Sequence, residues 1–150
     1  MIRWPFRKKW ETLGCALSSA EAASRIIDSA GEKFPLELKD ARYRAIPWDH
    51  FYDLMVRGLQ PILPYEAQIF DCDDMALCWE ADIRRYWAAR AKCNEALLCG
   101  QALLTMKSKT RHVMGWHLGD DGVFRLVECF KMLGFAFPFT NVQRIEQARG

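Results

Sequence analysis

The sequence predicts an α+β fold in which helices come first and an antiparallel sheet follows. Two observations predict this order. Apolar residues recur at three- and four-residue spacing in the first part of the chain, whereas beyond residue 95 short apolar runs alternate with turn-forming residues. The 150 residues, 51% of them hydrophobic, suffice for one core. We therefore expect one domain over 1–150, in which 1–16 forms a basic arm.

Three segments are expected to form helices. Residues 18–35 begin with Ser18 and Glu21 at the spacing of a capping box. Residues 46–61 have a proline near their start, where the first turn of a helix tolerates it. Residues 73–90 give the strongest helical pattern, because large apolar residues recur at every fourth position: Met75, Trp79, Ile83 and Trp87.

The remaining chain is expected to form the sheet. Segments 95–106, 111–118 and 122–130 have the apolar content of strands and are separated by the turn-forming stretches KSKT and GDDG. The apolar segment 134–141, which contains a proline, is expected to be a final short strand or a packed loop. Strands joined by short turns pair antiparallel, so the strongest predicted helix is expected to pack on an antiparallel sheet.

Charge and composition exclude several classes of protein. The formal net charge is only +2, so nothing predicts a nucleic-acid partner. No run approaches the roughly 18 apolar residues of a membrane-spanning helix, and no apolar core of a signal peptide follows the basic start. The six cysteines include no CxxC pair and, without a secretory signal, are expected to be reduced. Their spacing therefore predicts no metal site.

Cys72 is the candidate nucleophile. It stands immediately before the strongest predicted helix, where unpaired backbone N–H groups and the helix dipole stabilise a thiolate. Asp71, Asp73 and Asp74 oppose this effect, because neighbouring negative charge raises the pKa of a thiol. The alternative interpretation is a buried, inert cysteine. For Asp73 and Asp74, capping of the helix is the alternative to binding a cation.

His112 is the candidate base, and Glu128 is the group expected to orient it. His112 and His117 lie in one predicted strand an odd number of residues apart, so their side chains should face opposite sides. Glu128 lies in the next predicted strand, where an antiparallel hairpin brings it beside His112. A cysteine, a base and an acid in this order suit nucleophilic attack on a carbonyl carbon.

The segments FDCDDMAL around Cys72 and HVMGWHLGDDGVFRLVE from His112 to Glu128 resemble the papain-like and transglutaminase-like cysteine peptidases. The closer likeness is to the protease domain of the fairy-ring mushroom agglutinin and to related bacterial and phage proteins. The resemblance implies a papain-like/transglutaminase-like fold and a Cys-His-Glu triad, with Gln68 or Tyr65 as the oxyanion donor. It also implies a dependence on calcium, for which the aspartates beside the cysteine would supply oxygen ligands.

The expected function is that of a cysteine hydrolase or acyltransferase, a peptidase or amidase acting on a peptide or protein substrate. No cofactor is expected apart from the calcium that the resemblance implies. The alternative is a catalytically inactive structural or interaction protein, such as a phage-derived component that retains the fold. Arg111 and Cys129 depart from the family pattern and favour this alternative. The expected location is the cytoplasm of a bacterium or phage-infected host cell, or the virion.

Overall fold

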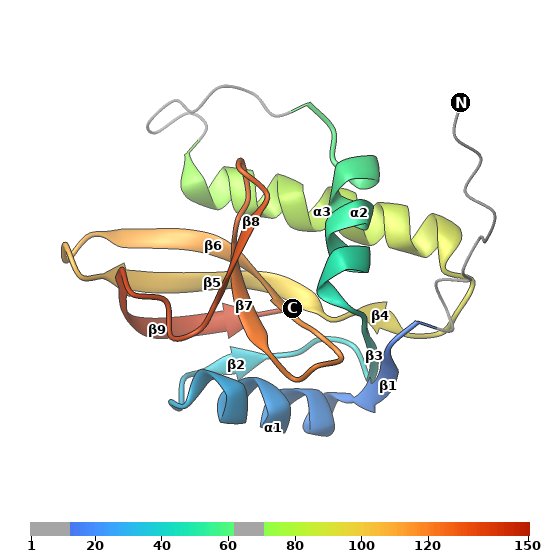
Figure 1. Ribbon diagram of the computed structural model, residues 1–150, viewed down its shortest axis with the longest axis horizontal. Coiled ribbons are helices and arrows are strands. Elements are labelled where there is room, and N and C mark those ends of the chain that lie inside the picture. Colours follow the sequence, from blue (N-terminus) through green and yellow to red (C-terminus); the bar gives the residue numbers. More distant parts are fainter. Residues whose placement is uncertain (1–12, 62–70) are drawn as a thin grey trace.

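A computed structural model describes residues 13–61 and 71–150 of the chain (Figure 1). In chain order, the elements are β1 (Cys15–Ser18), α1 (Ser19–Ala30), β2 (Leu36–Glu37), β3 (Arg42–Ala45), α2 (Trp48–Gly58), α3 (Cys72–Arg90), β4 (Ala96–Leu97), β5 (Cys99–Met106), β6 (Arg111–Leu118), β7 (Phe124–Glu128), β8 (Leu133–Ala136) and β9 (Val142–Arg149). Three helices therefore accompany nine strands in the described ranges.

The main sheet has six strands in the order β2-β9-β5-β6-β7-β8. Every neighbouring pair is antiparallel except β2 and β9, which run parallel. A second, smaller sheet has the order β1-β3-β4, with β1 antiparallel and β4 parallel to β3. Helix α1 covers one face of the main sheet, and α2 and α3 lie on the other (Figure 1).

The predicted arrangement, helices first and then an antiparallel sheet, is wrong. Strands β1, β2 and β3 lie between or before the helices, and both sheets are mixed. The sequence conceals these strands because each has four residues or fewer, too short to display an alternating pattern. The papain-like/transglutaminase-like assignment of this fold is corrected below, where known structures are compared.

Strand β9 has no counterpart in the prediction, because its burial pattern is not that of a regular strand. Its buried residues are Val142, Ile145 and Ala148, which recur every third position as they would on a helix. The register between β5 and β9 shifts twice, between Leu103 and Leu104 and again between Thr105 and Met106. Each irregularity changes which residues face the core, so the alternation expected of a strand is lost.

The three expected helices are confirmed, within a few residues at each end. Helix α1 begins with a complete capping box: the Ser18 hydroxyl accepts from the Glu21 backbone N–H, and the Glu21 carboxylate accepts from the Ser18 backbone N–H. It ends at Gly31, whose left-handed φ of 70° suits a residue without a side chain. The local sequence therefore determines both ends of this helix.

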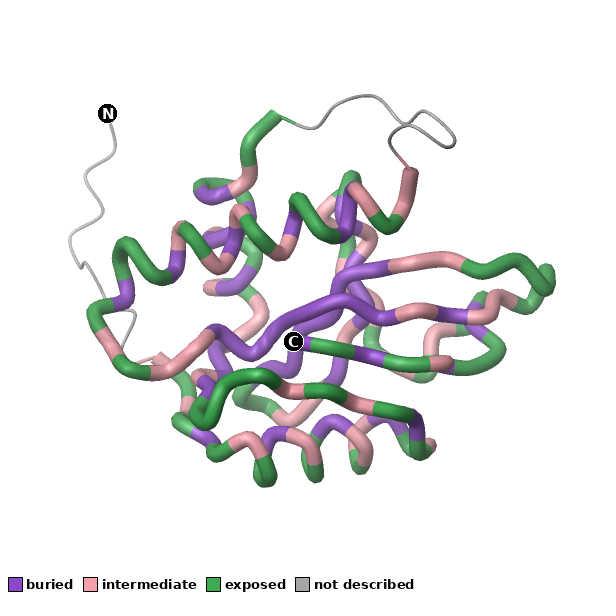
Figure 2. The backbone as a smooth tube through the Cα atoms, turned by 180° about the vertical axis from the view of Figure 1, so that it is seen from behind, coloured by how far each residue is buried: buried purple, intermediate pink, exposed green. Residues whose placement is uncertain are grey.

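The core has two parts, one on each face of the main sheet. The first joins α1 to β5, β6 and β7 around the fully buried Trp116, and the second joins α2 and α3 to the opposite face around Trp79. Figure 2 shows the buried residues concentrated along the middle strands of the sheet. At one point the packing needs a glycine, because a Cβ on Gly115 would lie 2.6 Å from the Trp79 ring.

None of the described helices is long and apolar enough to cross a membrane.

Candidate functional site

A cleft of about 640 Å³ lies beside the start of α3. Strands β2, β9, β5 and β6 form its floor and walls. Polar and charged groups line much of it, namely Glu37, Cys72, Asp73, Gln101, Arg111 and Arg149. A cleft of this volume is within the range that small-molecule sites occupy. Its lining offers hydrogen-bond donors, acceptors and charges of both signs to a polar ligand.

His112 and Glu128 form a pair at the margin of this cleft. Nε2 of His112 lies 3.2 Å from Oε2 of Glu128. Both side chains are largely buried, with exposed fractions of 24% for His112 and 19% for Glu128. His112 contributes to the cleft lining. The hairpin of β6 and β7 therefore brings together the two residues that were expected to act as base and orienting acid.

Cys72 is not hydrogen-bonded to His112. Side chains alternate along β6, where Met114 packs in the α1 cluster and Val113 packs against the α2–α3 cluster. His112 and Glu128 thus belong to the α1 side of the sheet by strand alternation, whereas Cys72 begins α3 on the other side. Both residues line the same cleft, and their predicted catalytic roles remain predictions.

The two residues expected to supply the oxyanion donor, Gln68 and Tyr65, lie outside the described residues, as does most of the expected basic arm. His117, the other histidine of β6, is fully buried and stacks on Phe51 with ring centroids 4.0 Å apart. Burial disfavours the charged imidazole and lowers the pKa of His117 to about 3. His117 is therefore a neutral part of the core.

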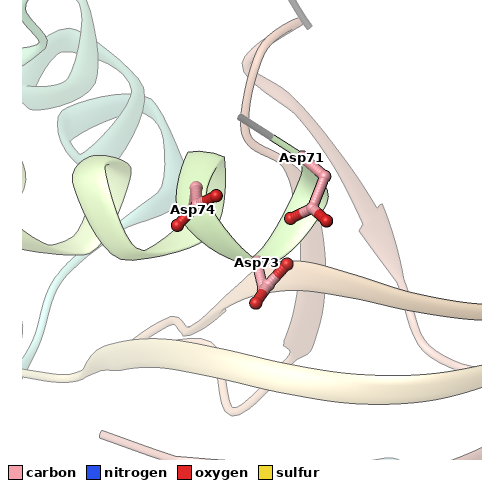
Figure 3. A group of neighbouring side chains, drawn as sticks. All are labelled: Asp71, Asp73 and Asp74. Carbon is pink, nitrogen blue, oxygen red and sulfur yellow. The ribbon is translucent and has the colours of Figure 1, made fainter. Parts of the chain in front are cut away.

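Three carboxylates cluster at the start of α3 (Figure 3). One oxygen from each of Asp71, Asp73 and Asp74 can be chosen so that all lie within 4.8 Å of one another. A side-chain hydrogen bond with Asp73 raises the pKa of Asp71 because it favours the protonated carboxyl, and the negative charges of Asp73 and Asp74 act in the same direction. Asp71 occupies the N-cap position but makes no side-chain capping bond. These oxygens are the ligands in this region that suit a hard cation, and calcium binding stays a prediction.

The structure adds a polar network that the sequence analysis missed. Gln101, only 5% exposed, donates from Nε2 to Oε2 of Glu80 at 2.6 Å and accepts at Oε1 from Arg149 at 3.2 Å. Glu80 also accepts from Arg84 at 2.8 Å. The position of Gln101 within an apolar predicted strand could have indicated a buried polar residue that needs hydrogen-bond partners. The sequence does not identify these partners, because they lie far away along the chain. The network holds one buried amide at the cleft.

Two of the remaining cysteines are unsuited to act as thiolate nucleophiles. Cys99 is fully buried and Cys129 is 3% exposed, and burial raises the pKa of each thiol to about 12. Cys129 instead accepts a hydrogen bond from the backbone N–H of Gly115 at 3.2 Å. All six cysteines are unpaired in the structure. These two residues act as small apolar side chains in the core.

No protein-family model and no curated protein matches the chain. Solved structures do match. The PSL1a-E64 complex gives a TM-score of 0.77 at 18% identity, over 90% of this chain and 51% of that chain. A lectin from Polyporus squamosus, bound to the human-type influenza-binding epitope Neu5Aca2-6Galb1-4GlcNAc, gives a TM-score of 0.74 at 19% identity, over 90% and 49%. The chain thus spans about half the length of these proteins, and the likeness shows the fold.

These comparisons correct the predicted family. One of the matched structures carries the name of a lectin. The predicted fold family, cysteine peptidase or amidase activity and enzyme class are therefore wrong, and the alternative of an inactive phage-derived component is not supported either.

Proposed function

We propose that this chain binds carbohydrate in the cleft beside α3. The fold it shares with a lectin is the observation that carries the proposal. That lectin is bound to a trisaccharide, and the partner proposed here is likewise a glycan rather than the peptide or protein expected from the sequence. Because the chain covers about half of the lectin, the proposal also rests on the chemistry of its own cleft.

The cleft lining suits a ligand rich in hydroxyl groups. Each sugar hydroxyl donates one hydrogen bond and accepts others, so a matching site needs both kinds of partner. Gln101 and Arg149 supply N–H donors, and Glu37 and Asp73 supply carboxylate acceptors. Leu103 and Val113 add apolar surface for the C–H faces of a ring. The volume of about 640 Å³ accommodates more than one sugar unit.

Arg149 is the cation best placed to contact a ligand. It lies in the cleft and forms no ion pair within the described residues, whereas Arg111 is paired with Glu146 at 2.7 Å. One of its terminal nitrogens donates to Gln101, and the other N–H groups of the guanidinium remain to be satisfied. A hydroxyl, carbonyl or carboxylate oxygen of a glycan would accept from them.

Titration calorimetry with Neu5Aca2-6Galb1-4GlcNAc and a glycan array test the proposal. We expect saturable binding to at least one glycan, with about tenfold weaker binding by Arg149→Ala through loss of charged donors. The matched control is Arg144→Ala, which removes another arginine of β9 that is 66% exposed and does not line the cleft. Absence of binding to any glycan, or equal losses in both variants, would overturn the proposal.

A further inference from the structure

We propose that Gln101 is the specificity-determining residue of the cleft and that it contacts two adjacent hydroxyl groups of a sugar ring. The inference rests on the proposed function and goes beyond it by naming the ligand group that the cleft selects. It follows from how the Gln101 amide is held and from the bonding positions that its partners leave open.

The orientation of the Gln101 amide is determined by two independent partners. A carboxylate accepts only, so the 2.6 Å contact with Glu80 must be made by the amide nitrogen. A guanidinium donates only, so the 3.2 Å contact with Arg149 must be made by the amide oxygen. The two contacts agree and exclude the flipped amide. Gln101 therefore presents its donor and its acceptor in fixed positions.

The supporting groups are themselves held in place. Glu80 is bonded through its other oxygen to Arg84, and Arg84 donates to the backbone carbonyl of Cys99 at 2.7 Å and lies 3.6 Å from Asp40. Arg84 is only a quarter exposed. A chain of charged groups from α3 and from the segment between β2 and β3 thus converges on one neutral amide. Charge-assisted bonds of this kind fix geometry more firmly than bonds between neutral groups.

The unused bonding positions define the ligand. A primary amide carries two N–H donors and two lone pairs on its oxygen. Glu80 and Arg149 occupy one of each, which leaves one donor and one acceptor for the cleft that Gln101 lines. Two neighbouring hydroxyls match this pair, because one accepts from the N–H while the other donates to the oxygen. A ring that lacks either hydroxyl leaves a buried polar group unpaired, which weakens binding.

A double-mutant cycle tests this assignment. Its two changes are Gln101→Met, which keeps the size of the side chain, and removal of single hydroxyls from the trisaccharide used as the probe above. We expect about tenfold weaker binding of the parent probe by the variant. We also expect one monodeoxy analogue to bind the wild type about tenfold more weakly, yet to bind the variant as well as the parent probe does.

Two further variants separate the amide from its support. Glu80→Gln removes the charged acceptor and leaves Gln101 free to flip, so the wild-type discrimination between parent and deoxy probe should shrink. Arg149→Met removes the donor to the Gln101 amide oxygen, and Arg149 is an exposed residue. This variant allows the same comparison of parent and deoxy probe if Gln101→Met lowers the thermal unfolding midpoint. In both variants we expect partial loss of discrimination, because the amide itself remains.

The outcomes distinguish this inference from the proposed function. If removal of each hydroxyl weakens binding by the same factor for the wild type and for Gln101→Met, Gln101 does not contact the ligand hydroxyls. Glycan binding by the chain then stands. If the wild type binds no glycan, the proposed function is overturned, and the assignment of Gln101 with it. If Gln101→Met binds one deoxy analogue and the parent probe with equal affinity, while the wild type discriminates between them, the result supports the proposed function and the assignment of Gln101.

Discussion

The imidazole of His117 lies against the ring of Phe51, with 4.0 Å between ring centroids and 21° between ring planes. Trp48 approaches the same imidazole at 5.8 Å, and no part of His117 is exposed. This position between α2 and the sheet has a measurable consequence for stability, because a buried imidazole must stay neutral.

We expect the free energy of unfolding to fall as the pH is lowered from about 6.5 towards 3. The pKa of His117 is lowered from 6.5 to about 3 in the fold, so in this window the unfolded chain binds a proton that the native chain does not. The loss approaches about 1.4 kcal/mol for each pH unit. Urea unfolding at several pH values measures it.

His117→Phe provides the control for this pH dependence. It keeps an aromatic ring against Phe51 and removes the proton-binding group, so the slope of stability between these pH values should be smaller than in the wild type. At pH 8 the two proteins differ only in packing. Parallel slopes for wild type and variant would show that His117 does not titrate in this way.

The capping box of α1 allows a matched comparison between adjacent serines. Ser18→Ala removes the hydroxyl that accepts from the Glu21 backbone N–H, and should lower the free energy of unfolding by about 1 kcal/mol. Ser19→Ala changes the first residue of the helix, whose side chain has no capping role, and should have little effect. Equal destabilisation by the two substitutions in urea unfolding would contradict the assigned cap.

The six thiols should differ in their reaction with iodoacetamide. Cys99 and Cys129 should react only on unfolding, because both are buried and the pKa of each is raised to about 12. Cys78 is exposed and should react in the folded protein. Cys72 lines the cleft, so a bound glycan should slow its labelling and leave that of Cys78 unchanged. Mass spectrometry of peptides gives the rate at each site.

Two labelling results would contradict this prediction. Labelling of Cys72 that a saturating glycan does not change would place the glycan elsewhere on the chain. Labelling of Cys99 at the rate of Cys78 would show that the second core cluster opens under native conditions.

The features that could be predicted from sequence depend on nearby residues. The start of α1 follows from the spacing of Ser18 and Glu21. The approach of His112 to Glu128 follows from a hairpin that joins residues 16 positions apart. In each case a local rule of geometry determines the contact. The same rule of strand alternation assigns His112 to the α1 face of the sheet, an assignment that is apparent only once the packing of the helices on each face is known.

The features that could not be predicted depend on distant partners. Gln101 bonds to residues 21 and 48 positions away, and no pattern in the sequence links Gln101 to Glu80 or Arg149. Strand β9 acquires its three-residue burial pattern from shifts in its pairing with β5. The parallel pairing of β2 with β9 joins segments more than a hundred residues apart. Such contacts require the complete fold.

Calorimetric titration of the wild-type chain and Arg149→Ala with the trisaccharide Neu5Aca2-6Galb1-4GlcNAc, supported by the glycan array, tests the central proposal most directly. We predict saturable binding to the wild type, about tenfold weaker binding to Arg149→Ala, and unchanged binding to Arg144→Ala. A folded wild-type chain that binds no glycan on the array or in the titration would contradict the account.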